Sequence, residues 1–187
     1  MRRILSAACL PAIAMLAGCS SAPTIPVAKD VDIDRFMGDW YVIANIPTRF
    51  EVGAHNAVET YKRDPRDGSI ATTFTYRDGS FDGEEKVMRP RGFVRPGTGN
   101  AVWGMQFVWP IKSEYLIAYV DPAYTQTIIA RSKLDYVWIM ARTPTLPPDQ
   151  YAALERRVHE LGYDLSKLQK GPQRWDGKTG PATTASP

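Results

Sequence analysis

The sequence predicts an all-β fold with one C-terminal helix, in which eight short antiparallel strands form a barrel or a sandwich. Between residues 38 and 142, short runs rich in β-branched and aromatic residues alternate with turn signals such as 64–68 and 96–100. A single helical pattern follows these runs. The 187 residues, 44% of them apolar, suit one domain of ordinary size.

The first strand is expected to begin directly after a short helical turn over 32–37. Gly38 suits a tight turn or a close approach of backbone. Residues 40–44 read Trp-Tyr-Val-Ile-Ala, and β-branched and aromatic residues favour a strand over a helix. The side chain of Trp40 brings a large apolar surface that normally has to be buried. We therefore expect Trp40 to plug one end of the barrel.

The remaining strands follow after a long loop over 47–53. Each is bounded by Gly, Pro, Asp or Asn. Pro90 lies within one of these runs, and we expect a bulge or a sheet edge there, because proline has no backbone N–H to donate. The seven expected ranges are 56–63, 69–76, 84–94, 101–108, 114–121, 125–131 and 136–142.

One helix is predicted over 147–162. Pro147 and Pro148 suit its first turn, and the negative charge of Asp149 is favourable near a helix N-terminus. An apolar stripe at helical spacing consists of Tyr151, Leu154, Val158 and Leu161. This stripe needs a surface to cover, and the outside of the sheet can provide it. Residues 165–175 are expected to pack back across the barrel.

The N-terminal stretch 1–18 reads as an export signal. It starts with Arg2 and Arg3 and continues with an apolar segment shorter than the ~20 residues of a membrane-spanning helix. Its end, Leu16–Cys19, resembles the cleavage box of bacterial lipoproteins, in which the cysteine becomes the acylated N-terminus. We predict lipidation of Cys19; the alternative is an ordinary secretory signal with an incidental cysteine.

The domain organisation follows from these patterns. Ser20 after the lipidated cysteine implies transfer to the outer membrane. Residues 19–31 read as the lipidated N-terminus and a flexible tether, and residues 32–175 as the folded domain. The Gly, Pro, Thr and Ser-rich tail 176–187 is expected to be disordered.

Charge and motifs exclude several classes of protein. The formal net charge is +3, and removal of Arg2 and Arg3 with the signal lowers it by two to +1, which gives no electrostatic basis for binding nucleic acid. His55 and His159, the two histidines, have no cysteine or carboxylate at metal-ligand spacing. The sequence also has no Gly-x-Ser-x-Gly elbow and no phosphate-binding loop. We therefore predict no catalytic residue, no metal site and no cofactor.

The alternation of side chains along the strands predicts a ligand cavity inside the barrel. Every second residue of a strand faces the same side, and the expected inner faces are rich in Trp, Tyr, Phe and Met. Such an interior suits an acyl chain, although the same side chains could simply fill the core. The predicted lining comprises Val42, Ala44, Phe74, Tyr76, Trp103, Met105, Phe107, Tyr115, Ile117, Tyr119, Trp138 and Met140.

Three motifs in order resemble those of lipocalins: Gly38-x-Trp40 at the first strand, Asp121–Tyr124 after the sixth, and Arg142 at the end of the last. With the lipoprotein box, the chain is most similar to bacterial lipocalins of the outer-membrane lipoprotein type, related to apolipoprotein D. The resemblance implies an up-and-down barrel over 32–175 that Gly38, Trp40 and Arg142 close. Packing of the guanidinium on the indole would be a cation–π contact of about 0.5–2 kcal/mol.

The resemblance also implies a function. It predicts a lipid-anchored protein on the periplasmic side of the outer membrane that binds a fatty acid or a lysophospholipid for lipid storage or transport. Homodimers occur in this subgroup. The alternatives are a structural or partner-binding lipoprotein with a filled barrel, an envelope enzyme, and an integral outer-membrane barrel. The last is disfavoured because the apolar stripe of the helix needs the barrel wall.

Overall fold

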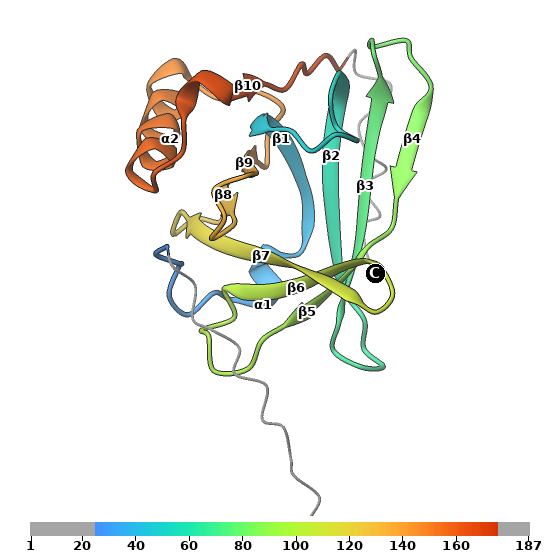
Figure 1. Ribbon diagram of the computed structural model, residues 1–187, viewed down its shortest axis with the longest axis vertical. Helices are drawn as coiled ribbons and strands as arrows, with labels where there is room; N and C mark the ends of the chain where they lie inside the picture. The colour runs from blue at the N-terminus through green and yellow to red at the C-terminus, as the bar shows by residue number, and fades with distance from the viewer. Residues whose placement is uncertain (1–24, 176–187) are drawn as a thin grey trace, which may run out of the picture.

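The barrel is the single architectural element around which the rest of the chain is arranged. The computed structural model describes residues 25–175, and the predicted signal, Cys19 and the predicted tail lie outside this range. Ten antiparallel strands form one sheet, which closes into a barrel with eight positions in its wall, and a helix lies on the outside (Figure 1). Neighbouring strands along the chain pair with one another, and pairing of the first with the last closes the cylinder. The predicted fold class is confirmed, as a barrel rather than a sandwich.

The strands occupy nearly the ranges expected from the sequence. A short helix α1 (Ile33–Phe36) precedes β1, and α2 (Pro148–Glu160) follows β9. The strands are β1 (Gly38–Ile46), β2 (Ala54–Arg63), β3 (Ile70–Asp78), β4 (Glu85–Met88), β5 (Arg91–Val94), β6 (Val102–Val108), β7 (Ile111–Val120), β8 (Gln126–Ala130) and β9 (Val137–Ala141). A 3-10 turn (Leu165–Lys167) leads into the two-residue strand β10 (Gln169–Lys170), which pairs with β1.

The expected strand 84–94 is interrupted at Pro90, so that β4 and β5 share one position in the barrel wall. Both pair with β3: Phe74 lies opposite Met88 in β4, and Ile70 opposite Gly92 in β5. Pro90 cannot donate to the ladder, but its carbonyl accepts from the backbone N–H of Thr72 at 3.1 Å. The interruption therefore lies where the sequence predicted an irregularity.

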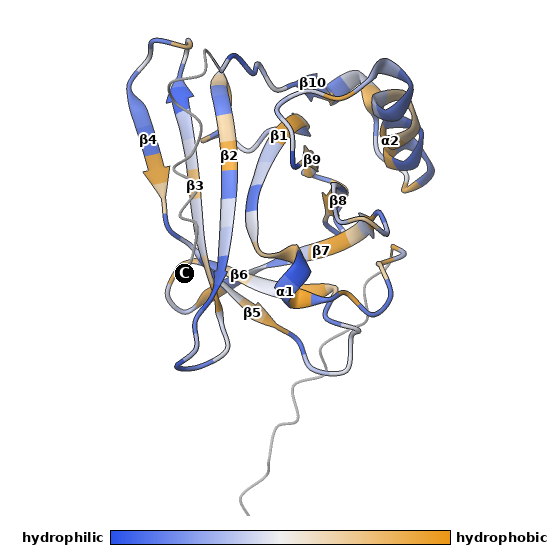
Figure 2. Cartoon of the chain, turned by 180° about the vertical axis from the view of Figure 1, so that it is seen from behind, coloured by the Kyte–Doolittle hydropathy of each residue, from blue (hydrophilic) through white to orange (hydrophobic). Residues whose placement is uncertain are grey.

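The outer face of β8 and β9 is covered by α2, as the apolar stripe predicted (Figure 1). Leu154 and Val158 of the helix are buried with Ile128 and Ile139 of the wall. Both faces of β8 and β9 are therefore apolar, and the hydropathy view shows the same helix with polar residues on its remaining surface (Figure 2).

Tyr163, directly after α2, joins the helix to the turn between β8 and β9. Its hydroxyl accepts from the backbone N–H of Arg131 at 2.8 Å and donates to the carbonyl of Tyr136 at 2.8 Å. This buried phenol therefore satisfies two backbone groups of the turn at once.

One end of the barrel is closed by packed aromatic rings. Phe36 of α1 lies between Trp40, Tyr61 and Trp103, with ring centroids 5.1–5.6 Å apart. All four side chains are buried, and the Trp40 indole donates to the carbonyl of Phe36 at 2.8 Å. Such tilted and edge-on ring pairs are favourable geometries for aromatic side chains.

Arg142 completes this closed end. Its guanidinium carbon lies 3.8 Å from the Trp40 ring centroid. Gly38 has φ +94°, and a Cβ on it would approach Nη1 of Arg142 to 3.3 Å, so glycine leaves room for the guanidinium. Burial lowers the pKa of Arg142 to about 10. Its N–H groups donate to the carbonyls of Asp39 (2.7 Å), Met37 (2.8 Å), Arg35 (2.9 Å), Phe36 (3.2 Å) and Tyr124 (3.2 Å).

Replacement of Arg142 by methionine is expected to lower the free energy of unfolding by about 2–4 kcal/mol, because several backbone carbonyls lose a charged donor. Arg142→Lys should restore only part of this loss, since a lysine cannot place donors in the same planar fork. Urea denaturation of the variants measures both effects.

The matched control is Arg157→Met. Arg157 also stacks on an aromatic ring, at 4.3 Å from the Tyr119 centroid, but it is exposed on the outside of the barrel. We expect Arg157→Met to lower the free energy of unfolding by less than about 1 kcal/mol. Equal losses for the two variants would contradict a special role of Arg142 in closing the barrel.

Candidate functional site

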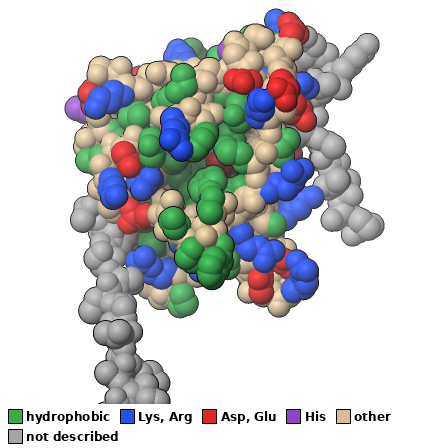
Figure 3. All heavy atoms as spheres, turned by 45° about the vertical axis from the view of Figure 1, so that its right-hand side comes forward, with side chains coloured by type: hydrophobic (Ala, Val, Ile, Leu, Met, Phe, Trp, Pro, Cys, Tyr) green, Lys and Arg blue, Asp and Glu red, His purple; other side chains and the backbone are tan. Residues whose placement is uncertain are grey.

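The other end of the barrel opens into a cavity of about 590 Å³. The space-filling view shows a hollow on this face, bordered by apolar side chains (Figure 3). Residues of β2, β3, β4, β6, β7 and β9 line it. Residues 48–51 before β2, residues 89–90 between β4 and β5, and Arg131 and Tyr136 between β8 and β9 complete the lining. The volume lies within the range of ordinary small-molecule sites.

Five of the predicted residues line this cavity: Phe74, Met105, Phe107, Tyr115 and Trp138. Phe74, Met105 and Tyr115 are buried in the wall, whereas Phe107 lies at the mouth and is 58% exposed. Side chains of this kind give the cavity a largely apolar surface with few polar atoms.

Five other predicted residues are inside the barrel but do not border the large cavity. They belong to the same buried cluster, packed below or beside the lining, and comprise Val42, Tyr76, Trp103, Ile117 and Met140. Trp103, for example, is stacked on Tyr115 at 5.5 Å and is part of the closed end. The part of the barrel next to the closed end is therefore filled with side chains, and the part next to the open end is hollow.

Ala44 and Tyr119 were wrongly assigned to the interior. Both lie on the outer side, in the cluster covered by α2. The register shifts between Val42 and Ala44 in β1, and between Ile117 and Tyr119 in β7. Each β-bulge adds one residue, so positions beyond it face the opposite side from the one that strict alternation predicts.

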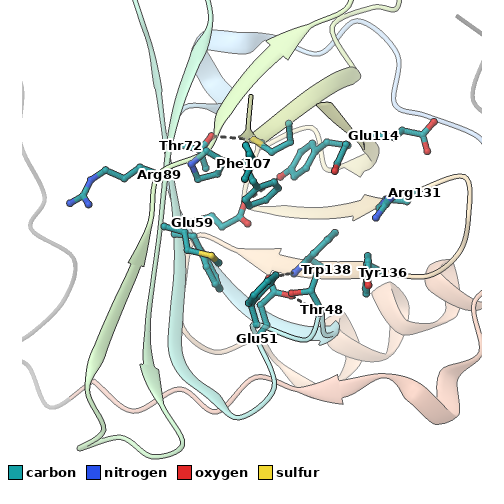
Figure 4. A pocket seen from close by; sticks show the side chains of 18 of the residues that line it. Thr48, Glu51, Glu59, Thr72, Arg89, Phe107, Glu114, Arg131, Tyr136 and Trp138 are labelled. Atoms are coloured by element: carbon teal, nitrogen blue, oxygen red, sulfur yellow. Dashed lines mark hydrogen bonds between the residues drawn. The ribbon is translucent and has the colours of Figure 1, made fainter. Parts of the chain in front are cut away.

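Glu51, a cavity residue that the sequence did not single out as a ligand contact, fixes the loop at the mouth. Its carboxylate accepts from the backbone N–H of Thr48 at 2.8 Å and from the indole of Trp138 at 3.1 Å. The side chain is only 6% exposed, and burial raises its pKa above the ordinary value. Figure 4 shows Glu51 joined to Thr48 and Trp138 by these two bonds.

Glu59 of β2, which the sequence did not single out either, directs a second carboxyl into the cavity (Figure 4). The Tyr115 hydroxyl lies 3.4 Å from it and is itself hydrogen-bonded to the hydroxyl of Tyr61. Burial raises the pKa of Glu59 to about 8, and the negative charge of Glu51 adds to the shift. The group is therefore mostly protonated at neutral pH. Its position between the inward-facing Ala57 and Tyr61 is the signal that could have found it.

Cationic side chains border the cavity at its mouth. Arg49 and Arg131 both border the cavity there. Arg131 pairs with Asp135 at 3.3 Å and lies over the Tyr136 ring, while its buried Nε has no hydrogen-bond partner. The arrangement can hold an apolar chain in the depth of the cavity and an anionic group at its entrance.

The comparisons with known proteins agree with this geometry. Residues 31–173 match the family model described as "Lipocalin-like domain". The chain belongs to the lipocalin family. This lipocalin is 32% identical over 165 residues to temperature-induced lipocalin-1 of Arabidopsis thaliana, covering 79% of this chain and 82% of the relative. It is 28% identical to the outer membrane lipoprotein Blc of Escherichia coli K12 (90% and 96% covered) and 27% identical to bovine apolipoprotein D (85% and 90%).

The fold comparison gives the same result for the architecture. The structure of insecticyanin from Manduca sexta aligns with a TM-score of 0.63 over 81% of this chain and 85% of that protein, at 16% identity. Lobster apocrustacyanin A1 aligns with a TM-score of 0.59 over 81% and 92%, at 13% identity. At such identities the likeness concerns the fold alone.

Within residues 25–175, no three or more His, Cys, Asp or Glu side chains gather into a group able to hold a metal ion. No helix of the described chain has the length and hydropathy needed to span a membrane.

The buried Glu59 predicts that stability falls as the pH rises. The unfolded chain loses this proton near pH 4.5, but the folded protein keeps it until about pH 8, so each step through this window favours unfolding. We expect the free energy of unfolding at pH 5 to exceed that at pH 8 by about 1–2 kcal/mol, less than the full linkage value because the carboxyl faces an open cavity.

Glu59→Gln should flatten this pH dependence and stabilise the protein at pH 8, whereas Glu85→Gln, at an exposed ion pair with Arg77, should leave it unchanged. Chemical denaturation at a series of pH values measures the slopes. An unaltered slope in Glu59→Gln would show that Glu59 is not the titrating group.

Proposed function

We propose that this lipocalin holds one single-chain lipid, a fatty acid or a lysophospholipid, in the cavity and serves lipid storage or transport in the cell envelope. The observation that carries the proposal is the cavity of about 590 Å³, open at one end and lined mainly by apolar and aromatic side chains. Burial of an acyl chain there would contribute roughly 25 cal/mol per Å² before the costs of association.

The charges favour entry of the ligand with its chain first. A carboxylate or phosphate in the depth of the cavity would meet the carboxyl groups of Glu51 and Glu59. At the mouth, the same anionic group would meet Arg49 and Arg131. Since an anion is costly to bury without a cationic partner, the head group belongs at the mouth and the chain inside.

Residues 1–19, outside the described range, support the proposed location. The lipoprotein box ending in Cys19 and the similarity to proteins named outer membrane lipoprotein Blc both favour a lipid anchor in the outer membrane. A multiply acylated cysteine would hold the protein firmly, because each buried CH₂ contributes about 0.8 kcal/mol.

Filling the cavity is the sharpest test of lipid binding. Thr72 is a buried residue of β3 that lines the cavity, whereas its neighbour Thr73 does not border it. Thr72→Phe should reduce the affinity for oleate and lysophosphatidylethanolamine at least about tenfold by occupying the space of the chain. Thr73→Phe, the same substitution on the other face, should retain binding.

Native mass spectrometry and tryptophan fluorescence of the chain with Cys19→Ser measure this binding. A saturable one-to-one adduct that only Thr72→Phe removes supports the proposal. If the parent protein takes up neither lipid while folded, the barrel serves a structural or partner-binding role instead.

Anchoring has its own test. In a Gram-negative host, an alkyne-labelled palmitate should label the protein, and Cys19→Ser should abolish both the label and recovery in the outer-membrane fraction, because no other residue would carry the acyl chains. Cys9→Ser is the control, since the signal that contains it is expected to be removed. Unchanged labelling in Cys19→Ser would rule out this anchor.

A further inference from the structure

Two turns at the mouth of the barrel expose an unusual number of large apolar side chains. Eight large apolar residues of the described chain are exposed, and six of them are on these two turns. We call them the mouth patch: Phe50, Val52, Phe107, Val108, Trp109 and Ile111. The first two lie between β1 and β2, and the other four at the turn from β6 to β7. Trp109, at the tip of that turn, is 82% exposed.

The mouth patch and the cavity are continuous. Phe50, Phe107 and Val108 belong to the patch and also line the cavity. Apolar side chains gather around the hollow in the space-filling view of this face (Figure 3). A contiguous exposed patch of this kind is costly in water and marks an interaction surface.

Positive charge accompanies the patch. Arg49 and Lys112 are exposed neighbours of it in the sequence, and none of the ion pairs within residues 25–175 involves either of them. Their charged groups lie over the rings of Phe50 (4.5 Å) and Phe93 (3.7 Å). The carboxylate of Glu114, also at the mouth, is bound by the backbone N–H and hydroxyl of Ser132.

We propose that the mouth patch docks on the surface of a lipid bilayer with anionic head groups, so that the cavity opens onto that surface. Tryptophan prefers the interface between head groups and acyl chains, and the aliphatic and phenyl side chains around it would leave water there. The ammonium and guanidinium groups would meet the phosphates of anionic lipids.

A bilayer fits this surface better than a second copy of the chain. In a two-fold dimer through the mouth patch, each copy would present Arg49 and Lys112 to the same face of its partner, which brings like charges together. Residues of both turns line the cavity, so such a dimer would also cap its opening. A bilayer with anionic head groups offers the opposite charge, and single-chain lipids dissolved in it would lie next to the opening.

Docking and ligand binding are separate properties. Docking is tested at Trp109 and Ile111, which do not line the cavity, whereas binding of the proposed ligand depends on the cavity wall. If the mouth is docked on a bilayer, a lipid can pass from the bilayer into the barrel without crossing water. Docking and ligand binding together would therefore allow lipid exchange at the membrane surface.

Vesicle flotation tests the docking. The full chain with Cys19→Ser is used throughout, so that no acyl anchor contributes and residues 1–18 are common to all variants. Vesicles of phosphatidylethanolamine with phosphatidylglycerol are compared with vesicles of phosphatidylcholine alone. We expect the double variant Trp109→Ser, Ile111→Ser to reduce the bound fraction at least about fivefold, and phosphatidylcholine vesicles to bind less of the parent protein.

The matched control is Val87→Ser in β4, which changes an exposed apolar residue outside the mouth patch and should alter flotation less than about twofold. Trp109→Phe keeps an apolar ring and should still float. Brominated lipids should quench the fluorescence of the parent protein more strongly than that of Trp109→Phe, because Trp109 would be the residue in contact with lipid.

Equal flotation of the parent and the double variant would overturn the proposal. So would a parent protein that does not float but forms a dimer, with the dimer lost in the double variant, since the patch would then be an interface between two copies. Oleate binding measured on the same samples separates these results from a failure of the cavity: docking can be lost while the adduct is kept.

Discussion

The stack of Arg142 on Trp40 is the interaction on which the rest of the barrel depends. It joins the first strand to the end of the last, 102 positions apart in the sequence, at the point where the sheet has to close on itself. The guanidinium also binds backbone carbonyls of α1 and of the start of β1 at the closed end. Because that end is held by packed rings and charged donors, the opposite end can stay open without loss of the fold.

Closure by pairing of short strands could be predicted from the sequence, and so could the contact of Arg142 with Trp40 at the closed end. Trp103, by contrast, was expected in the cavity lining and is packed against Phe36 at the closed end instead. The strand ranges, the irregularity at Pro90, the helix with its stripe and the location of that helix outside the wall all follow from local patterns of one element each. The two β-bulges do not. Whether a strand bulges depends on its partners in three dimensions, and so the predicted inward positions Ala44 and Tyr119 turned out to face α2.

The acidic groups in the cavity show a second limit of sequence patterns. A glutamate in a half-buried strand is ordinarily read as a solvent-exposed position, because burial of its charge is costly. Inside the barrel, Glu59 has the Tyr115 hydroxyl within reach, and burial raises its pKa so that the group is mostly neutral. Glu51 keeps its place through the Trp138 indole and the loop backbone. These are long-range pairings, and a single sequence does not reveal them. They give the apolar cavity polar atoms at fixed positions, which a uniformly apolar lining would lack.

Besides covering the barrel wall, the segment with the C-terminal helix is attached to the open end of the barrel through the phenol of Tyr163. The Tyr163 hydroxyl binds the backbone of the turn between β8 and β9, which lies at the open end of the barrel. The segment from residue 142 to residue 163 therefore helps to fix the position of this turn. We expect a change in the length of that segment to shift this turn, which carries the lining residues Arg131 and Tyr136, while the identity of every lining residue stays the same. The shape of the entrance can thus drift in evolution through insertions on the outside of the molecule, while the closed end and the lining stay as they are.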